Sequence, residues 1–288
     1  MSQSILERAE EFIWKNARLL ERRLFAVHFK DGSPDSVIDA LRPYQNADGG
    51  FGHALEPDIR CPDSQPVPVE HALRILDRVG FDGEIVKAAC DYLTSITTSE
   101  GGVPWLLPSA HGYPRAPWWN TDDAPPASVN PTAAIAGMLH RNRFEHEWLE
   151  GATSFCWSKI AEMELTDPHD MAEVLTFLNN VPDRERAESE LTRVVDQLFS
   201  FGLVADADAE GYVSKPLDWA PTPDHPLRKH FRDEDIDANL DVLVAGQQED
   251  GGWNITWEPI SPACEIEWRG GVTLDALLTL RANGRLNA

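Results

Sequence analysis

Apolar residues recur every three to four positions along most of the chain, which is the pattern of amphipathic α-helices. Ile85, Ala89 and Leu93 form one such stripe. Strand-like alternation is confined to short pieces flanked by glycine and proline. The sequence therefore predicts an all-α protein with about ten helices, at residues 4–29, 34–44, 68–79, 84–97, 131–141, 145–163, 168–180, 185–201, 234–248 and 272–283.

Prolines separate these helices. They cluster at residues 57–68, 104–131 and 216–226. A proline inside a helix costs ~3 kcal/mol, so the three stretches are expected to be loops. Each loop leads into a new helix that has proline near its first turn, where the missing N–H group is not needed.

One thirteen-residue phrase occurs twice, as QNADGGFGHALEP at residues 45–57 and as QQEDGGWNITWEP at residues 247–259. In each copy a helix ends in glutamine and is followed by a glycine turn, an aromatic residue and Glu-Pro. The glycines accept the positive φ of a tight turn. The amides of Gln45 and Gln247 are long enough to bind backbone groups at helix ends, and the aromatic ring is expected to fill the space between helices.

Two weaker copies lie between the strong ones, at residues 101–108 and 211–221. A unit of helix, glycine turn, short hairpin and helix that repeats every 40–60 residues is typical of stacked repeat proteins. Because the first and last copies match best, we expect them to become neighbours in a closed ring. A ring also needs no polar capping repeats.

The pattern Gln-x-x-Asp-Gly-Gly-Phe/Trp at residues 45–51 and 247–253 resembles the repeat of squalene–hopene cyclases and of protein prenyltransferase β subunits. The resemblance implies one domain over residues 1–288, an (α/α)6-type toroid with short β-hairpins at the repeat turns and a central cavity. Six helical hairpins require twelve helices, so the 4–29 segment or the region around 222–232 is expected to hold the missing ones. The motif is more specific for the fold than for the reaction.

Composition and charge restrict the classes of molecule that the protein is expected to bind. The net charge is −23 and the pI is about 4.6, which disfavours nucleic acid because phosphate backbones are repelled. The chain shows no secretory signal, no transmembrane run and no paired cysteine motif, so we expect a cytoplasmic protein with reduced thiols. The sequence leaves the oligomeric state open.

Carboxylates are the first group of candidate site residues. Glu56, Asp58 and Glu258 follow the repeat turns, and Glu267 follows the second of them. Carboxylates that converge in a partly apolar cavity raise one another's pKa, which suits a general acid. The structural alternative is that Glu56 and Glu258 cap backbone as part of the repeat, whereas Asp58 and Glu267 have no symmetric mate.

Two further sets follow from the resemblance. The cyclases protonate an alkene with the third residue of Asp-x-Asp-Asp, which Asp122 matches in Asn-Thr-Asp-Asp and Asp237 matches in Asp-Ile-Asp-Ala. Tryptophan faces stabilise a carbocation, bind sugars or fill a core. The candidates for substrate binding are Trp118, Trp119, Trp219, Trp257, Trp268 and Arg269.

No cofactor is required for acid-initiated chemistry. Prenyltransferase β subunits hold zinc with Asp, Cys and His, and Asp58 and Cys61 with His53 or His71 echo that set only loosely. The sequence supports a magnesium site for a diphosphate only weakly. We therefore predict no metal ligands, and the sequence leaves the identity of any cofactor open.

These observations predict an isoprenoid-handling enzyme that resembles class II terpene cyclases. It would cyclise or isomerise a hydrophobic polyene in an aromatic-lined cavity after protonation by Asp58, Glu267, Glu56 or Glu258. One alternative is a non-catalytic toroid that binds an apolar ligand or a partner's chain. Another is a carbohydrate-active toroid that uses paired carboxylates.

Overall fold

The computed structural model describes residues 3–286 and is all-α over that range, as the sequence predicts. Within this range β structure is limited to three isolated bridges, which pair Gln45 with Phe51, Phe51 with Gln65, and Ile59 with Arg115. The predicted β-hairpins at the repeat turns are therefore wrong. Side-chain amides and single backbone hydrogen bonds hold the turns instead of paired strands.

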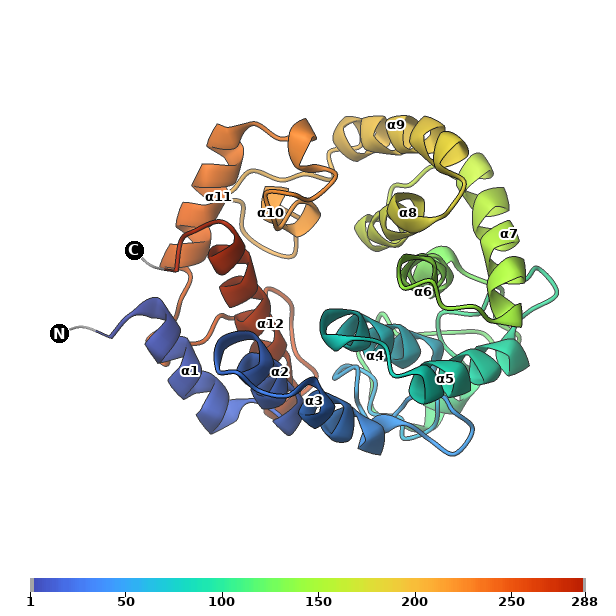
Figure 1. Ribbon diagram of the computed structural model, residues 1–288, viewed down its shortest axis with the longest axis horizontal. Coiled ribbons are helices and arrows are strands. Elements are labelled where there is room, and N and C mark those ends of the chain that lie inside the picture. Colours follow the sequence, from blue (N-terminus) through green and yellow to red (C-terminus); the bar gives the residue numbers. More distant parts are fainter. Residues whose placement is uncertain (1–2, 287–288) are drawn as a thin grey trace. The chain divides into compact units, whose positions relative to one another are not determined.

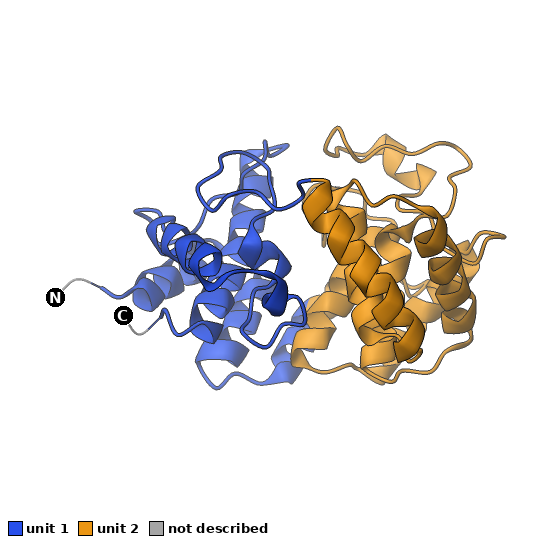
Figure 2. Cartoon of the chain, turned by 90° about the horizontal axis from the view of Figure 1, so that it is seen from above, with its two compact units in different colours: residues 1–40, 202–288 blue, residues 41–201 orange. Residues whose placement is uncertain are grey.

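The chain forms two compact units, and Figure 2 colours them separately. Unit 1 comprises residues 1–40 and 202–288. In it α12 packs against α1, α2 and α11, and α10 packs against α11. Its helices are α1 (Ile5–Asn16), α2 (Leu19–Phe29), α10 (Pro216–Trp219), α11 (Asp233–Ala245) and α12 (Pro262–Ala282), and α3 (Pro34–Leu41) leads from it into unit 2.

Unit 2 comprises residues 41–201 and consists of two helical layers. Helices α4, α6 and α8 are neighbours in one layer, and α5, α7 and α9 pack against them in the other (Figure 1). The helices are α4 (Pro66–Val79), α5 (Gly83–Ile96), α6 (Val129–Arg141), α7 (Glu147–Glu162), α8 (Pro168–Asn180) and α9 (Arg184–Ser200). Whether residues 1–288 form one toroid domain stays a prediction.

Two helices of unit 1 differ from the bounds predicted from sequence. The two regions that differ contact each other at Gly270 and Ala17. The predicted 4–29 helix is broken at Ala17, whose backbone is extended. Helix α12 begins at Pro262, earlier than expected, with the Ser261 side chain as its N-cap. A Cβ added to Gly270 of α12 would lie 2.9 Å from the Cβ of Ala17. The absence of a side chain at Gly270 thus lets α12 approach the break between α1 and α2.

The first repeat turn joins residues 45–51 to the start of α5. Gln45 donates from Nε2 to the carbonyl of Gly49 at 2.9 Å and to that of Ile85 at 3.2 Å. Gly49 has φ +88°, and an added Cβ would lie closer than 3.0 Å to the carbonyl oxygen of Ala88. The glutamine and the glycine therefore contact α5 at positions three residues apart, on one face of that helix.

The last repeat turn has the same geometry against α1. Gln247 donates from Nε2 to the carbonyls of Gly251 and Ile5, both at 2.9 Å. Gly251 has φ +93°, and an added Cβ would overlap the carbonyl oxygen of Arg8. The spacing from Ile5 to Arg8 equals the spacing from Ile85 to Ala88. Both strong copies thus dock a glutamine and a glycine onto the first two turns of a neighbouring helix.

Only one of the two weaker copies shares this structure. Thr98 donates its backbone N–H to Gly102 at 2.9 Å, and an added Cβ on Gly101 would lie 2.9 Å from the carbonyl oxygen of Gly151 in α7. Gly211 has φ +89°, but an added Cβ there would meet no atom within 4 Å. The copy expected at residues 211–221 therefore does not form the docking turn.

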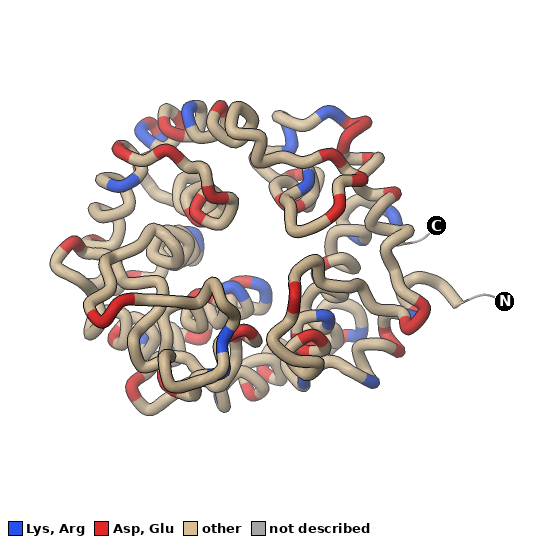
Figure 3. The backbone as a smooth tube through the Cα atoms, turned by 180° about the vertical axis from the view of Figure 1, so that it is seen from behind, with Lys and Arg blue, Asp and Glu red and all other residues tan. Residues whose placement is uncertain are grey.

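Acidic residues outnumber basic residues in this protein. The chain has 48 Asp and Glu residues against 25 Lys and Arg residues. Figure 3 shows the acidic positions on helices and loops of each unit. No helix within residues 3–286 combines the length and the apolar character needed to cross a membrane.

Candidate functional site

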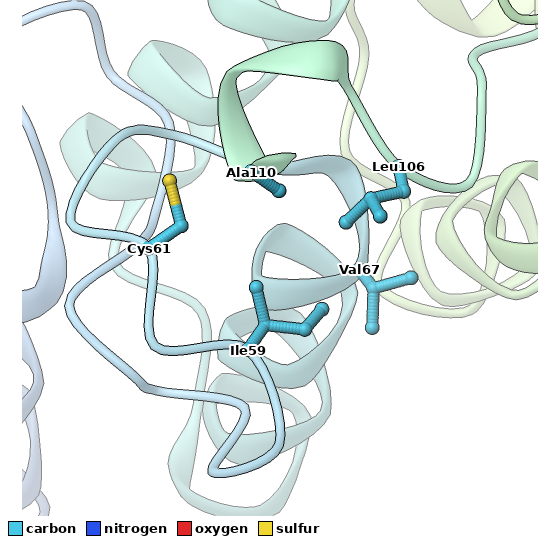
Figure 4. Close-up of a cluster of buried hydrophobic side chains, with 5 residues drawn as sticks. All are labelled: Ile59, Cys61, Val67, Leu106 and Ala110. Carbon is cyan, nitrogen blue, oxygen red and sulfur yellow. The ribbon is translucent and has the colours of Figure 1, made fainter. Parts of the chain in front are cut away.

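A small apolar cluster in unit 2 joins the loop after the first repeat turn to the loop at residues 103–128. Figure 4 shows its buried side chains, which come from the 52–65 loop, the first turn of α4 and the second loop. Two partly buried rings, Trp105 and Trp119, pack against it, with their centroids 5.0 Å apart. The five residues of the cluster are Ile59, Cys61, Val67, Leu106 and Ala110.

Glu56 lies beside this cluster and is only 2% exposed. Its Oε2 accepts the backbone N–H of Asp58 at 2.8 Å, and its Oε1 accepts the indole N–H of Trp119 at 3.1 Å. Asp58 is equally buried, and its carbonyl accepts the backbone N–H of Ala116 at 3.0 Å. The structure thus brings together three predicted site residues, and both oxygens of Glu56 accept hydrogen bonds, from its own loop and from Trp119 rather than from the backbone of a neighbouring helix.

Arg115 holds the loop that carries Trp119. It donates from Nε to the carbonyl of Trp119 at 2.6 Å, from one terminal nitrogen to the carbonyl of His111 at 3.1 Å, and from the other to the side chain of Asn120 at 3.3 Å. A planar guanidinium that binds several acceptors at once fixes a loop without regular secondary structure. The position of Trp119 is therefore built into the loop.

Glu56→Gln is expected to lower the free energy of unfolding by about 1–3 kcal/mol. A glutamine has one acceptor oxygen, so its NH₂ group would face one of the two N–H donors and leave it unsatisfied. Urea denaturation measures the loss, and Asp122→Asn, at an exposed position, is the control with a change within about 0.5 kcal/mol. Unchanged stability of Glu56→Gln together with lost activity would contradict the structural role.

The predicted residues of unit 1 fall into two groups. Trp257 and Trp268 contact each other, with centroids 5.1 Å apart, and Glu267 is partly buried next to Trp268 on α12. Glu258 is exposed although it occupies the same repeat position as the buried Glu56. The two glutamates are therefore not equivalent in structure.

Two other predicted residues of unit 1 are engaged inside the protein. Trp219 is buried and donates its indole N–H to the carbonyl of Leu203 at 3.1 Å. Arg269 is buried, donates to Asp250 at 2.8 Å and to the carbonyl of Trp253 at 3.1 Å, and lies over the Phe12 ring. These contacts make Arg269 part of the last repeat turn.

The candidates drawn from aspartate pairs lie on the surface. Asp122 and Trp118 are exposed in the 103–128 loop. Asp237 pairs with Arg285 at 2.9 Å and its side chain is 66% exposed. Neither aspartate therefore lies in the apolar cavity that the resemblance expects around the proton donor.

Sequence reasoning missed a buried charge cluster between α4 and α8 of unit 2. Glu70 and Glu173 are each about 5% exposed, and both accept hydrogen bonds from Arg74. The distance from Arg74 to Glu173 is 2.9 Å. The available signal was an acidic residue inside an apolar helical run, as in Val-Pro-Val-Glu and Met-Ala-Glu-Val-Leu. We name this set the Glu70–Arg74–Glu173 cluster.

The cluster holds two carboxyl groups and a single guanidinium. Ionisation of both glutamates would leave a net negative charge in a buried place, which is costly. The pKa of Glu173 is accordingly raised well above 4.5, chiefly by burial and next by the charge of Glu70, although Arg74 opposes the shift. The carboxyl of Glu173 therefore keeps its proton to a higher pH than an exposed glutamate does.

Two neighbours complete the surroundings of Glu173. Its Oε2 accepts the backbone N–H of Ala134 at 3.2 Å, in the first turns of α6. The Cys156 thiol lies near Glu173, and its pKa is raised chiefly by burial and next by the negative charge that Glu173 carries when it is ionised. Arg74 keeps 40% of its side chain exposed, so the cluster is open to solvent on one side. A carboxyl whose pKa is raised by burial has the properties of a general acid.

Within residues 3–286, no three His, Cys, Asp or Glu side chains are grouped so that they could hold a metal ion. Cys61 instead lies in the apolar cluster, where burial raises the pKa of its thiol. The set of Asp58, Cys61 and a histidine therefore does not fit zinc in this structure.

Comparison with known proteins shows a likeness of fold. No family model and no curated protein matches the chain. A solved crystal structure described as a protein from Actinoplanes matches with a TM-score of 0.55 and 18% identity, over 96% of this chain and 89% of that chain. At this identity the likeness concerns the fold alone.

Proposed function

We propose that this protein is an enzyme that uses a buried carboxylic acid to protonate a hydrophobic polyene, with Glu173 as the proton donor. The observation that carries the proposal is the pair of buried carboxyls, Glu70 and Glu173, which both accept hydrogen bonds from a partly exposed Arg74. The isoprenoid substrate class comes from the resemblance of the Gln-x-x-Asp-Gly-Gly repeat to that of squalene–hopene cyclases.

The chemistry balances without a cofactor. Glu173 transfers its proton to one carbon of an alkene, and the neighbouring carbon becomes a carbocation. Attack by another double bond closes a ring, and loss of a proton to the carboxylate pair restores the acid, so the net reaction is an isomerisation. After the transfer the cluster carries one net negative charge, which attracts the cation.

We propose further that the repeats arrange residues 1–288 as an (α/α)6-type toroid around an apolar cavity. Twelve α-helices occur within residues 3–286, the number that six hairpins require. Three glycine turns dock in the same way onto α1, α5 and α7. In this arrangement α4, α6 and α8 are inner helices, and the small hydrophobic substrate would lie beside the partly exposed residues of α4 and α8, near Arg74.

The proposal is tested by incubating the protein with squalene, prenyl diphosphates and oligosaccharides and analysing the products by mass spectrometry. We expect a prenyl or polyprenyl substrate to be consumed without a metal, and Glu173→Gln to slow that reaction by about 10²–10⁴-fold. Glu188→Gln, an exposed glutamate on α9, is the control and should react at the wild-type rate.

A second candidate function is supported by the same cluster. Two carboxyls, one protonated and one ionised, are the usual equipment for hydrolysing a glycosidic bond. Cleavage of an oligosaccharide that is lost in both Glu173→Gln and Glu70→Gln would favour this function over the isoprenoid one. An apolar molecule that co-purifies while nothing in the panel is consumed would instead identify a binding protein.

A further inference from the structure

We infer that Tyr212, Trp257 and Trp268 of unit 1 form a binding site for a small alkylated ammonium ion, such as the head group of choline. The inference rests on side chains in unit 1 alone. It is independent of the acid chemistry proposed for the Glu70–Arg74–Glu173 cluster, which lies in unit 2.

The three rings are arranged at right angles. The centroids of Tyr212 and Trp257 are 5.6 Å apart with an interplanar angle of 72°. The centroids of Trp257 and Trp268 are 5.1 Å apart at 86°. Rings turned in this way present faces in different directions, so a cation beside Trp257 can lie against more than one face.

The rings keep accessible surface although they touch one another. Tyr212 is 58% exposed, and Trp257 and Trp268 are partly buried. Burial of all three faces would indicate a packed core. Partly exposed aromatic rings in mutual contact can instead bind a methylated ammonium ion, because its methyl groups contact the rings and its charge interacts with their electron-rich faces.

The loop that carries Tyr212 is held in place by its own hydrogen bonds. Ala205 donates its backbone N–H to the carbonyl of Ser214 at 2.8 Å, and this bond closes the loop. Lys215 donates from Nζ to the carbonyl of Ala207 at 2.9 Å. Trp268 lies on α12, and this helix positions it independently of the loop that carries Tyr212. The site is therefore positioned before a ligand binds, which limits the ordering cost of binding.

The charge around the rings favours a cation. Each ring has an acidic residue within two positions in the chain, and these are Glu210, Glu258 and Glu267. Arg269, which follows Trp268 in the chain, is paired with Asp250 and stacked over Phe12. The net charge of −23 adds a long-range attraction for cations and a repulsion for anions.

The ligand class is tested by calorimetric titration of the full chain with choline and with 3,3-dimethylbutan-1-ol, a neutral molecule of the same shape. We expect choline to bind at least about tenfold more tightly than the alcohol, because only the cation is attracted by ring faces. Tyr212→Ala and Trp257→Leu should each weaken choline binding about tenfold. Trp14→Ala, at another exposed tryptophan of unit 1, should leave it unchanged.

Equal affinity for choline and the alcohol would overturn the inference, because it would show an apolar site without selectivity for charge. Absence of choline binding up to about 10 mM would overturn it as well. Tyr212 is exposed, so its variant folds and decides the question even if Trp257→Leu does not fold. Choline binding by Glu173→Gln should equal that of the wild type, which separates this site from the proposed catalytic one.

Discussion

Gly251→Ala is expected to lower the free energy of unfolding by about 2–5 kcal/mol. The positive φ of +93° costs a non-glycine residue about 1–2 kcal/mol. The added Cβ would also overlap the carbonyl oxygen of Arg8, and such overpacking against backbone costs about 1–3 kcal/mol more. Gly49→Ala, which would overlap the carbonyl of Ala88, should behave alike. Thermal or urea unfolding of the purified variants measures both losses.

Gly211→Ala is the matched control for this prediction. Its φ of +89° is close to that of Gly251, but an added Cβ meets no atom within 4 Å. It should therefore lose only the backbone cost of about 1–2 kcal/mol. If Gly251→Ala and Gly211→Ala were equally stable, the docking of the repeat turn onto α1 would contribute nothing.

Arg74→Met is expected to lower the free energy of unfolding by about 2–4 kcal/mol at pH 7. It removes the one cation that compensates Glu70 and Glu173, and an uncompensated buried charge costs about 3–5 kcal/mol. The lower figure applies because 40% of the Arg74 side chain is exposed to solvent. Arg141→Met, which breaks an exposed pair with Asp77, should cost less than about 1 kcal/mol.

The loss in Arg74→Met should depend on pH in a fixed direction. The pKa of Glu173 is raised above 4.5, so the folded state binds its proton more tightly than the unfolded state does. The stability from that proton is complete below about pH 4.5 and is lost as the pH rises through the raised pKa. Without Arg74 that pKa rises further. Unfolding curves between pH 4 and 8 should therefore show the variant approaching the wild type at acidic pH, and a constant difference would contradict the buried pair.

The helices could be predicted from sequence because their apolar stripes and proline caps are local features. The break at Ala17 could not, because neither glycine nor proline marks it, and its contact with Gly270 involves a residue far away in the chain. The same glycine hid the first half of α12, since Gly270 and Gly271 look like a loop in sequence. The β-hairpins failed because Gln45 satisfies the turn with its side chain.

The candidate site residues also divide into those that could be predicted from the sequence and those that could not. Glu56, Asp58 and Trp119 were found because the repeat marks their loops, although the structure gives Glu56 the role of an acceptor. The Glu70–Arg74–Glu173 cluster was missed because its meaning depends on burial and on a contact between α4 and α8. In sequence an isolated glutamate on a helix is indistinguishable from a solvated one.

The two segments of unit 1 have a consequence for synthesis on the ribosome. Residues 1–40 emerge first, yet α1 and α2 pack against α12, which emerges last. At about 5–20 residues per second, the apolar faces of α1 and α2 wait roughly 10–50 s for their partner, while unit 2 can fold in the meantime. Nascent chains of this protein therefore expose the apolar faces of α1 and α2 during synthesis, and holdase chaperones would bind there.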